Sequence, residues 1–271
     1  DIEAAAKAAH AAGAILAVDA TATGAVTTQP LTLGADIVFH SATKYLNGHS
    51  DVLAGVLVTR DDNQRWTDLR MLRTKMGAPL APLDCFLLMR GLRTVFVRYR
   101  QCSANAMAIA KHFEGHPKVE RVLYPGLASH PGHAIAVRQM RDGFGGMMSL
   151  LVKGGFDDAQ KLCTRLKVIV PATSLGGVES LAEHRKTVEG PTSPVAWPAA
   201  SDKETPLRIW TRAAARSGPG LYGLQHRAQT VSAGRHRLAS PQGQRDSGVP
   251  AVWLFTVPVK VTAAFVVFNS V

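Results

Sequence analysis

The sequence predicts an α/β fold, and three observations support this prediction. An alanine-rich segment typical of a helix, at 2–12, is followed by short uncharged apolar runs at 14–18 and 37–39. Continuous apolar runs of this length are typical of strands that are buried on both faces, as in a mainly parallel sheet. A third run at 52–59 completes the order helix, strand, helix, strand, loop, strand, which predicts a layered α/β domain.

Local signals give the expected bounds of the other elements. Gly13 ends the first helix, because glycine is a poor helix former. A short helix fits between the first two strands, at 30–35. Further along the chain we expect helices at 80–94 and 103–113, a loop rich in Gly, Pro and His at 125–132, and a smaller α+β part at about 143–184.

The last quarter of the chain differs from the rest in composition. The chain has 271 residues and a formal net charge of +11, and residues 196–271 contain nine Lys and Arg but three Asp and Glu. Ala, Ser, Gly, Pro and Gln are common there, without a helical or strand period before residue 250. We therefore expect residues 196–271 to form a divergent, basic and poorly ordered tail. The tail lacks interleaved aromatic residues, so its charge does not predict a specific nucleic-acid site.

Cysteine content and hydropathy bear on the cellular compartment. Cys85, Cys102 and Cys163 form no CxxC pair, which excludes a disulfide framework and fits a reducing compartment, so we expect a cytoplasmic protein. The chain opens with no apolar segment flanked by basic residues, so we expect no signal peptide. The uncharged run at 261–271 is shorter than the roughly 20 residues of a membrane-spanning helix. Its β-branched residues favour a strand or an aggregation-prone segment, and we expect no membrane anchor.

Polar residues follow the first two predicted strands. Asp19 ends the first strand, and Ser41, Thr43 and Lys44 follow the second. Ligands of open α/β sheets bind at the carboxyl ends of the strands, so these four side chains are candidates for one site. A buried carboxylate, two hydroxyls and a lysine make a poor metal site, because softer or additional ligands are missing.

The same four residues suit a phosphorylated aldehyde. Desolvation would reduce the preference of Lys44 for its charged form, which makes it an amine able to form a Schiff base. Ser41 and Thr43 can donate hydrogen bonds to a phosphate, and Asp19 can keep a pyridine nitrogen protonated. A protonated ring is the electron sink that carbanion chemistry at an amino acid requires.

Each of these residues also has a purely structural alternative. Lys44 could be a solvated surface charge, like most lysines. Asp19 could be the N-cap of the following segment. Ser41 and Thr43 could satisfy backbone groups at a strand end.

Two other motifs predict no site. His130 and His133 have the HxxH spacing of a zinc pair, but Pro131 and Gly132 break the helix that such a pair needs. We interpret that segment as a surface loop. The glycines at 143–146 lack the spacing of a dinucleotide-binding fingerprint and predict a turn.

Longer motifs around the candidate residues resemble a known family. The strings VDAT at 18–21 and GADIVFHSATKYLNGHSD at 34–51 closely resemble the lysine region of the pyridoxal-phosphate (PLP) enzymes of Cys/Met metabolism. This family includes cystathionine γ-synthase, cystathionine γ-lyase and methionine γ-lyase. Further matching strings are RGLRT at 90–94, YPGL at 124–127, SHPGH at 129–133, GFGGM at 143–147 and SLGGVES at 174–180. The resemblance covers about residues 1–195.

The resemblance implies a fold, a cofactor and roles for individual residues. The fold is that of the fold-type-I PLP-dependent transferases, with 1–142 as the later part of the PLP-binding large domain and 143–195 as the start of the smaller C-terminal domain. The cofactor is pyridoxal 5′-phosphate, held in a Schiff base by the catalytic Lys44. The remaining implied roles are Asp19 at the pyridine nitrogen, Thr21 near the ring, Ser41 and Thr43 at the phosphate, and Ser174 at the substrate carboxylate.

The resemblance also implies an activity. It is transsulfuration, by γ-replacement or γ-elimination on substrates such as cystathionine or homoserine esters. Thr173 stands where lyases of the family tend to carry an acid, which slightly favours synthase-type chemistry. Family members are tetramers with active sites shared between subunits, so the resemblance implies a homo-oligomer that acts on small sulfur amino acids.

The chain departs from the family at both ends. Family members have a further N-terminal stretch with a glycine-rich phosphate loop, so we expect this chain to be truncated there. After residue 195 the family segment LLRLSVGIE, whose arginine binds the substrate α-carboxylate, is replaced by a different sequence. This change suggests a shifted reading frame or an alternative exon, and Arg208 is a weak candidate for that arginine. The alternative to an active enzyme is therefore a catalytically inactive fragment that acts as a partner of full-length subunits.

Overall fold

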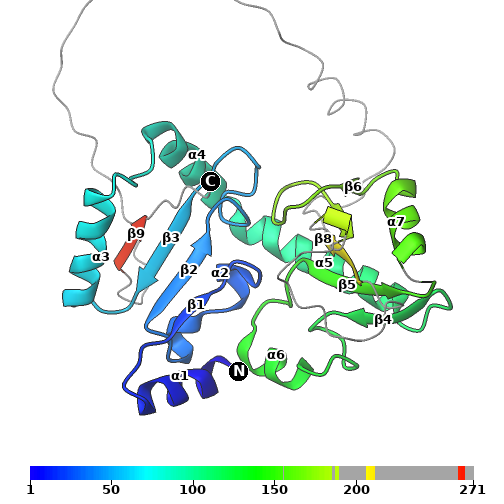
Figure 1. Cartoon of the computed structure of the whole chain (residues 1–271), viewed down its shortest axis with the longest axis horizontal. Coiled ribbons are helices and arrows are strands. Elements are labelled where there is room, and N and C mark those ends of the chain that lie inside the picture. The colour runs from blue at the N-terminus through cyan, green and yellow to red at the C-terminus, as the bar shows by residue number, and fades with distance from the viewer. Residues whose placement is uncertain (155, 185–186, 189–205, 211–261, 266–271) are drawn as a thin grey trace, which may run out of the picture. The chain divides into compact units, whose positions relative to one another are not determined.

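The computed structural model describes residues 1–154, 156–184, 187–188, 206–210 and 262–265. Within these ranges the chain forms two β-sheets and a set of helices (Figure 1). All of these residues belong to one contact unit, Asp1–Ala214 together with Val261–Val271.

The first sheet has the strand order β1-β2-β3-β9. Its strands are β1 (Ala17–Asp19), β2 (Ile37–Ser41), β3 (Gly55–Thr59) and β9 (Thr262–Phe265). β1 and β2 are parallel, whereas β3 is antiparallel to both β2 and β9. The prediction of a mainly parallel sheet is therefore wrong for the described strands. The connection from β2 to β3, residues 42–54, contains no helix, and a parallel return is usually built around one.

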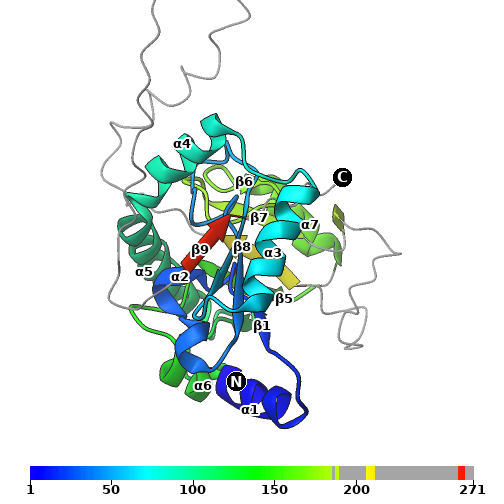
Figure 2. The same cartoon turned by 90° about the vertical axis from the view of Figure 1, so that its left-hand side faces the viewer.

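The N-terminal segment is tied to a helix from the middle of the chain. α1 (Ile2–Ala11) is capped by Asp1, whose side chain accepts a hydrogen bond from Ala4 N. Gln139, at the end of α6 (His133–Gln139), accepts a hydrogen bond from Ile2 N at 3.2 Å and donates one to Asp1 Oδ1 at 2.8 Å. Segments 137 residues apart in sequence therefore lie side by side (Figure 2).

Short helices connect β1 to β2, and longer ones follow β3. The connection contains α2 (Gly24–Thr27) and the 3₁₀ helix η1 (Pro30–Leu33). After β3 come α3 (Gln64–Lys75), α4 (Pro82–Leu92) and α5 (Val95–Phe113). None of the described helices has the length and apolar character needed to cross a membrane.

The second sheet has the strand order β4-β5-β8-β7-β6. Its strands are β4 (Val119–Leu123), β5 (Met147–Val152), β6 (Val170–Pro171), β7 (Leu181–His184) and β8 (Pro206–Trp210). The β6 and β7 pair is parallel, and the other neighbours are antiparallel. α7 (Phe156–Arg165) contacts β7.

α5 contributes residues to two hydrophobic cores. Its first turns place Val95, Tyr99 and Cys102 in a cluster with β3, α4 and the turn after β2. Its last turns place Ala106 and Ala110 in a second cluster with β4, β5 and α7. The spacing of these residues, three or four apart, keeps them on one face of the helix. α5 therefore links the two sheets through a continuous buried stripe.

Several predicted elements are confirmed, with different bounds. The helix predicted at 2–12 is α1, the segment at 80–94 contains α4, and the helix predicted at 103–113 is the second half of α5. Residues 125–132 form turns without a helix or strand, as expected of a loop. β8 falls within 196–260, where no strand was predicted. β9 falls within 261–271, where a strand was one of the two expectations. The other residues of 196–271 lie outside the described residues, and the domain boundaries stay predictions.

Three helices lie outside the predicted segments, and the shortest of them, α2, has only four residues. α3 was missed because its sequence, QRWTDLRMLRTK, is polar and buries only Trp66. α6 was missed because it has only seven residues and follows a loop rich in Gly, Pro and His. Each is defined by its tertiary contacts more than by a periodic apolar pattern.

Leu150→Ala should lower the free energy of unfolding by about 2–5 kcal/mol, because it removes buried methyl groups and leaves a cavity. Leu150 is 1% exposed in the core that α5 shares with β5, whereas Leu83 on α4 is 67% exposed. Leu83→Ala is the matched control and should change stability by no more than about 0.5 kcal/mol. Urea denaturation followed by circular dichroism measures both. Equal losses would contradict the assigned core.

Candidate functional site

Hydrogen bonds join three of the predicted site residues. Asp19 ends β1, and its Oδ1 accepts a hydrogen bond from Thr21 N at 2.9 Å. Thr21 Oγ1 accepts a hydrogen bond from Ser41 N at 2.7 Å, and Ser41 is the last residue of β2. Since β1 and β2 are paired in parallel, both strands end at the same edge of the sheet. The structure therefore brings Asp19, Thr21 and Ser41 together.

Lys44 lies in the turn that follows Ser41. Its backbone N donates a hydrogen bond to Ser41 O at 3.1 Å. Its half-buried side chain extends to Ser174, where Nζ donates a hydrogen bond to Oγ at 3.3 Å. These two residues are 130 positions apart, and only the family resemblance connected them at the sequence level. The structure places both in one site.

Thr43 has a structural role in the described contacts. Its Oγ1 accepts a hydrogen bond from Ala54 N at 3.0 Å and donates a weaker one to Ala54 O at 3.4 Å. The hydroxyl thus bridges the two ends of the connection between β2 and β3, as the strand-end alternative predicts. A phosphate contact at Thr43 stays a prediction, and it would require the weaker of these two bonds to break.

Asp19 is exposed, whereas its place at the end of an apolar run predicts a buried carboxylate. The reason is that β1 is the edge strand of the described sheet, so β2 flanks it on one side only. Asp19 is also not a helix N-cap, because α2 begins at Gly24 with Thr23 as its N-cap. Burial lowers the pKa of the neighbouring His40, and the charge of Asp19 acts in the opposite direction on it.

A buried arginine that was not predicted as a site residue contacts the turn after Lys44. Arg98 lies on α5, and its Nη1 donates a hydrogen bond to Tyr45 O at 2.9 Å. Its Nη2 donates to Leu46 O at 3.3 Å and to Gly91 O at 2.8 Å. One signal in the sequence could have indicated this residue. Arg98 is the one cation on the buried face of α5, whose other residues are apolar or small.

Gly176 allows the loop that carries Ser174 to lie close to the turn that carries Lys44. A β-carbon at Gly176 would lie 2.5 Å from Tyr45 N and 2.9 Å from the carbonyl carbon of Lys44. The backbone of Gly176 also has φ +77°, in the left-handed region that glycine adopts most easily. Both observations explain the glycine in the SLGGVES motif, which allows the two backbones to approach each other.

Arg208 lies in β8, and its backbone pairs with Ser149 on one side and Glu183 on the other. Its side chain lies outside the described residues. The suggestion that Arg208 binds a substrate carboxylate therefore stays a prediction.

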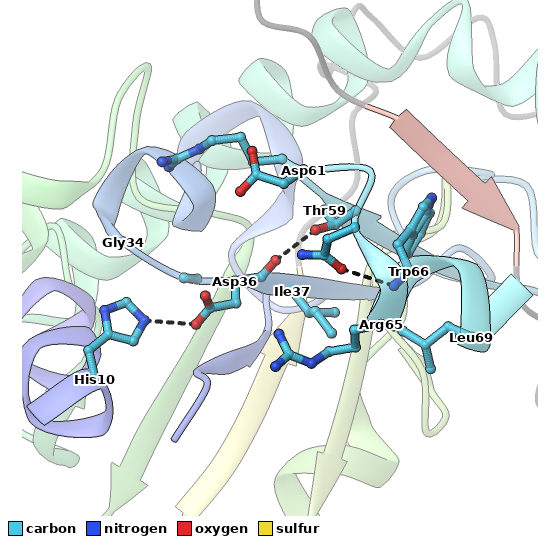
Figure 3. Close-up of a pocket in the computed structure, with 12 residues that line it drawn as sticks. His10, Gly34, Asp36, Ile37, Thr59, Asp61, Arg65, Trp66 and Leu69 are labelled. Carbon is cyan, nitrogen blue, oxygen red and sulfur yellow. Dashed lines mark hydrogen bonds and ion pairs between the residues drawn. The ribbon is translucent and has the colours of Figure 1, made fainter. Parts of the chain in front are cut away.

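A cavity of about 160 Å³ lies apart from these residues, beside β2 and the start of α3 (Figure 3). Its lining includes His10 and Asp36, whose Nε2 and Oδ2 atoms are 2.8 Å apart. The hydrogen bond from His10 lowers the pKa of Asp36, with a further contribution from Leu16 N. None of the predicted site residues lines this cavity. Among the described residues, no three His, Cys, Asp or Glu side chains gather as a metal-ion site would require.

Comparison with known proteins gives consistent similarities. The sequence profile described as Cys/Met metabolism PLP-dependent enzyme matches residues 1–193. The chain is 50% identical over 183 residues to a cystathionine gamma-lyase of Dictyostelium discoideum, covering 68% of this chain and 47% of that protein. It is 52% identical over 167 residues to a cystathionine gamma-synthase of Mycobacterium tuberculosis, covering 62% of this chain and 42% of that protein.

Solved structures are similar over a comparable region. The crystal structure of a cystathionine gamma synthase from Xanthomonas oryzae pv. oryzae, in complex with aminoacrylate and cysteine, superposes with a TM-score of 0.74 at 40% identity. The match covers 79% of this chain and 55% of that one. This chain thus spans about half the length of the relatives it matches. The similarity supports the predicted fold-type-I PLP architecture over part of the chain.

Gly176→Ala should destabilise the protein more than Gly115→Ala. Both glycines have a similar positive φ, +77° and +76°, but no atom lies within 4 Å of a β-carbon placed at Gly115. The left-handed conformation alone costs about 1–2 kcal/mol at either position. The contact with Tyr45 should add about 1–3 kcal/mol at Gly176. Thermal and urea unfolding of the two variants measure the difference, and equal losses would show that the loop does not touch the turn.

Stability should fall as the pH decreases from about 6.5, partly through His40. Burial lowers the pKa of His40 below its usual value of 6.5, so the unfolded chain binds more protons in this range. The stabilisation is complete above pH 6.5 and is lost as the pH falls through the folded-state pKa. His40→Gln should therefore reduce the dependence of unfolding free energy on pH. Because the pKa of His130 is also lowered, the dependence should shrink without vanishing.

Urea titrations at a series of pH values below 6.5 measure this effect. His112→Gln, a change at an exposed side chain of α5, is the control for the effect of a His-to-Gln change on the pH dependence of the unfolding free energy. If the unfolding free energy of His40→Gln depended on pH as strongly as that of His112→Gln, His40 would not be buried as described.

Proposed function

The chain belongs to the Cys/Met metabolism PLP-dependent enzyme family, and from this premise we propose that it carries the lysine-bearing part of a transsulfuration active site. The observation that supports the proposal most directly is the hydrogen bond between Lys44 Nζ and Ser174 Oγ. It joins the half-buried residue that the resemblance gives as the Schiff-base lysine to the residue that it gives at the substrate carboxylate.

The described residues fit pyridoxal phosphate by the chemistry of their side chains. A primary amine, a carboxylate and hydroxyl groups are connected through Asp19, Thr21, Ser41 and Lys44 at one sheet edge. The amine suits an aldehyde, the hydroxyls suit a phosphate, and the carboxylate suits a protonated ring nitrogen. We propose Lys44, Asp19, Thr21, Ser41 and Thr43 as the residues of this chain that hold the cofactor. When bound, pyridoxal phosphate supplies the electron sink for carbanion chemistry at an amino acid.

Ser174 is suited to hold the substrate carboxylate. Its Oγ accepts a hydrogen bond from Lys44, so its own hydroxyl proton can be donated to a carboxylate oxygen. The carboxylate of an amino acid is one bond away from Cα. The Lys44 amine is therefore placed to accept a proton from Cα of a substrate held at Ser174, as a general base must be.

We assign the substrate class to sulfur amino acids and their precursors. The relatives named above are a cystathionine gamma-lyase and cystathionine gamma-synthases. On this basis the proposed reaction is γ-elimination from cystathionine or γ-replacement on a homoserine ester, in a homo-oligomer. The weak preference for synthase-type chemistry rests on Thr173, which precedes Ser174.

Lys44 should be the main site of pyridoxal phosphate attachment. The purified chain is incubated with pyridoxal phosphate, reduced with borohydride, digested and mapped by mass spectrometry. We expect the adduct at Lys44, and Lys44→Ala should lower total incorporation to the level of scattered surface labelling. Lys111→Ala, at an exposed lysine of α5, is the matched control and should leave the Lys44 adduct unchanged. Labelling spread evenly over the lysines would contradict the proposed site.

Two activity assays separate the candidate functions. Release of a thiol from cystathionine reports γ-elimination, and formation of cystathionine from cysteine and a homoserine ester reports γ-replacement. An adduct at Lys44 without either activity would support the alternative of an inactive partner of full-length subunits. Loss of the adduct as well would contradict both.

A further inference from the structure

The guanidinium of Arg98 connects two backbone segments inside the protein. Arg98 is 8% exposed, and within the described residues its donors reach three carbonyl oxygens and one hydroxyl. Two of the carbonyls, those of Tyr45 and Leu46, directly follow Lys44. The other partners are Gly91 O and Thr94 Oγ1, at the junction of α4 and α5. A buried cation is costly unless hydrogen bonds satisfy it, so this arrangement fixes both segments.

Two glycines allow the chain to pack closely around this guanidinium. A β-carbon at Gly48, where φ is +72°, would overlap the guanidinium of Arg98. A β-carbon at Gly91 would overlap the backbone of Asn47. The turn and the α4–α5 junction therefore lie as close as their backbones allow, with Arg98 between carbonyls of both.

The turn that carries Lys44 has little regular structure to hold it. Within the turn, Lys44 N donates to Ser41 O at 3.1 Å and Gly48 N donates to Lys44 O at 2.8 Å. The next two carbonyls, which in a helix or strand would have backbone partners, are instead bound by Arg98. A lysine side chain has four rotatable bonds, so a small change in its backbone moves the amine substantially.

We propose that Arg98 is a positioning residue for the Lys44 amine. It holds the backbone just after Lys44 so that Nζ stays beside Ser174. Arg98 does not itself touch a substrate. The proposal rests on the proposed function, because positioning matters only if Lys44 is the reactive amine.

Arg98→Met should lower the trapping of pyridoxal phosphate at Lys44 by about ten- to a hundredfold per folded molecule, since misplacement of a reacting group has effects of this size. Arg98→Lys should reduce it less, because an ammonium keeps the charge but cannot reach both turn carbonyls with a planar fork. Gln139→Ala is the matched control. Gln139 is also 8% exposed and hydrogen-bonded to backbone and side chain, but it serves the α1–α6 contact. It should lose stability without loss of trapping.

Two readouts test the proposal without the cofactor. Amide hydrogen exchange at residues 45–48 should become faster in Arg98→Met and not in Gln139→Ala. Acylation of Lys44 by acetic anhydride, relative to the other lysines, should increase severalfold in Arg98→Met, because the amine loses its hydrogen bond to Ser174 and is more open to the reagent. If Arg98→Met does not fold, the same comparisons are made with Arg98→Lys.

The outcomes separate this proposal from the proposed function. Absence of a Lys44 adduct in the unmodified protein would defeat the proposed function, while exchange and acylation would still show whether Arg98 holds the turn. Wild-type trapping per folded molecule in Arg98→Met, or unchanged exchange and acylation, would overturn the positioning role. An arginine that only stabilises the fold would lower stability and speed exchange at 45–48, but it would leave Lys44 trapping per folded molecule and Lys44 acylation at the control level.

Discussion

The backbone of the turn after β2 is the constraint on which the proposed site depends. Lys44 can be directed at a reacting atom only if its own backbone is fixed, and that backbone belongs neither to a helix nor to a strand. The fold holds it by close contacts from three separate segments. Arg98 binds the carbonyls of Tyr45 and Leu46, Gly176 packs against Tyr45 N, and Tyr45 OH accepts a hydrogen bond from Gly146 N at 3.3 Å. Precision at the amine therefore comes from tertiary packing.

The use of an arginine here has a physical reason. A buried charge paired with a carboxylate often contributes little net stability, because desolvation of both groups offsets their attraction. Backbone carbonyls at a turn have no ladder partner and would be costly to bury without donors. The five N–H groups of one guanidinium can satisfy several of these carbonyls at once, in a fixed geometry. The planar fork thus replaces the hydrogen bonds that a helix or strand would supply.

The sequence predicted the local features well and the long-range ones only through resemblance. Apolar runs ending at Asp19 and before Ser41 were enough to place two strand ends at one edge, because parallel pairing puts them there. The antiparallel direction of β3 was not predicted, since it depends on a helix-free connection rather than on the apolar run itself. The contact between Lys44 and Ser174 spans 130 residues, and no periodicity or spacing encodes it. Arg98 was visible as a cation on an apolar helical face, but its partners are carbonyls, which carry no sequence signature.

The Ser174 side of the site depends on a strand that the family resemblance does not reach. Ser174 lies in the loop between β6 and β7, and β7 is paired on its other side with β8. β8 also pairs with β5, so it lies inside the second sheet between two antiparallel neighbours. The family profile ends at residue 193, whereas β8 begins at Pro206. Since the pattern of β8 is too short to specify a strand alone, its neighbours in the sheet stabilise it. The position of the loop that carries Ser174 is therefore coupled, through β7, to a strand that lies beyond the residues matched by the family profile.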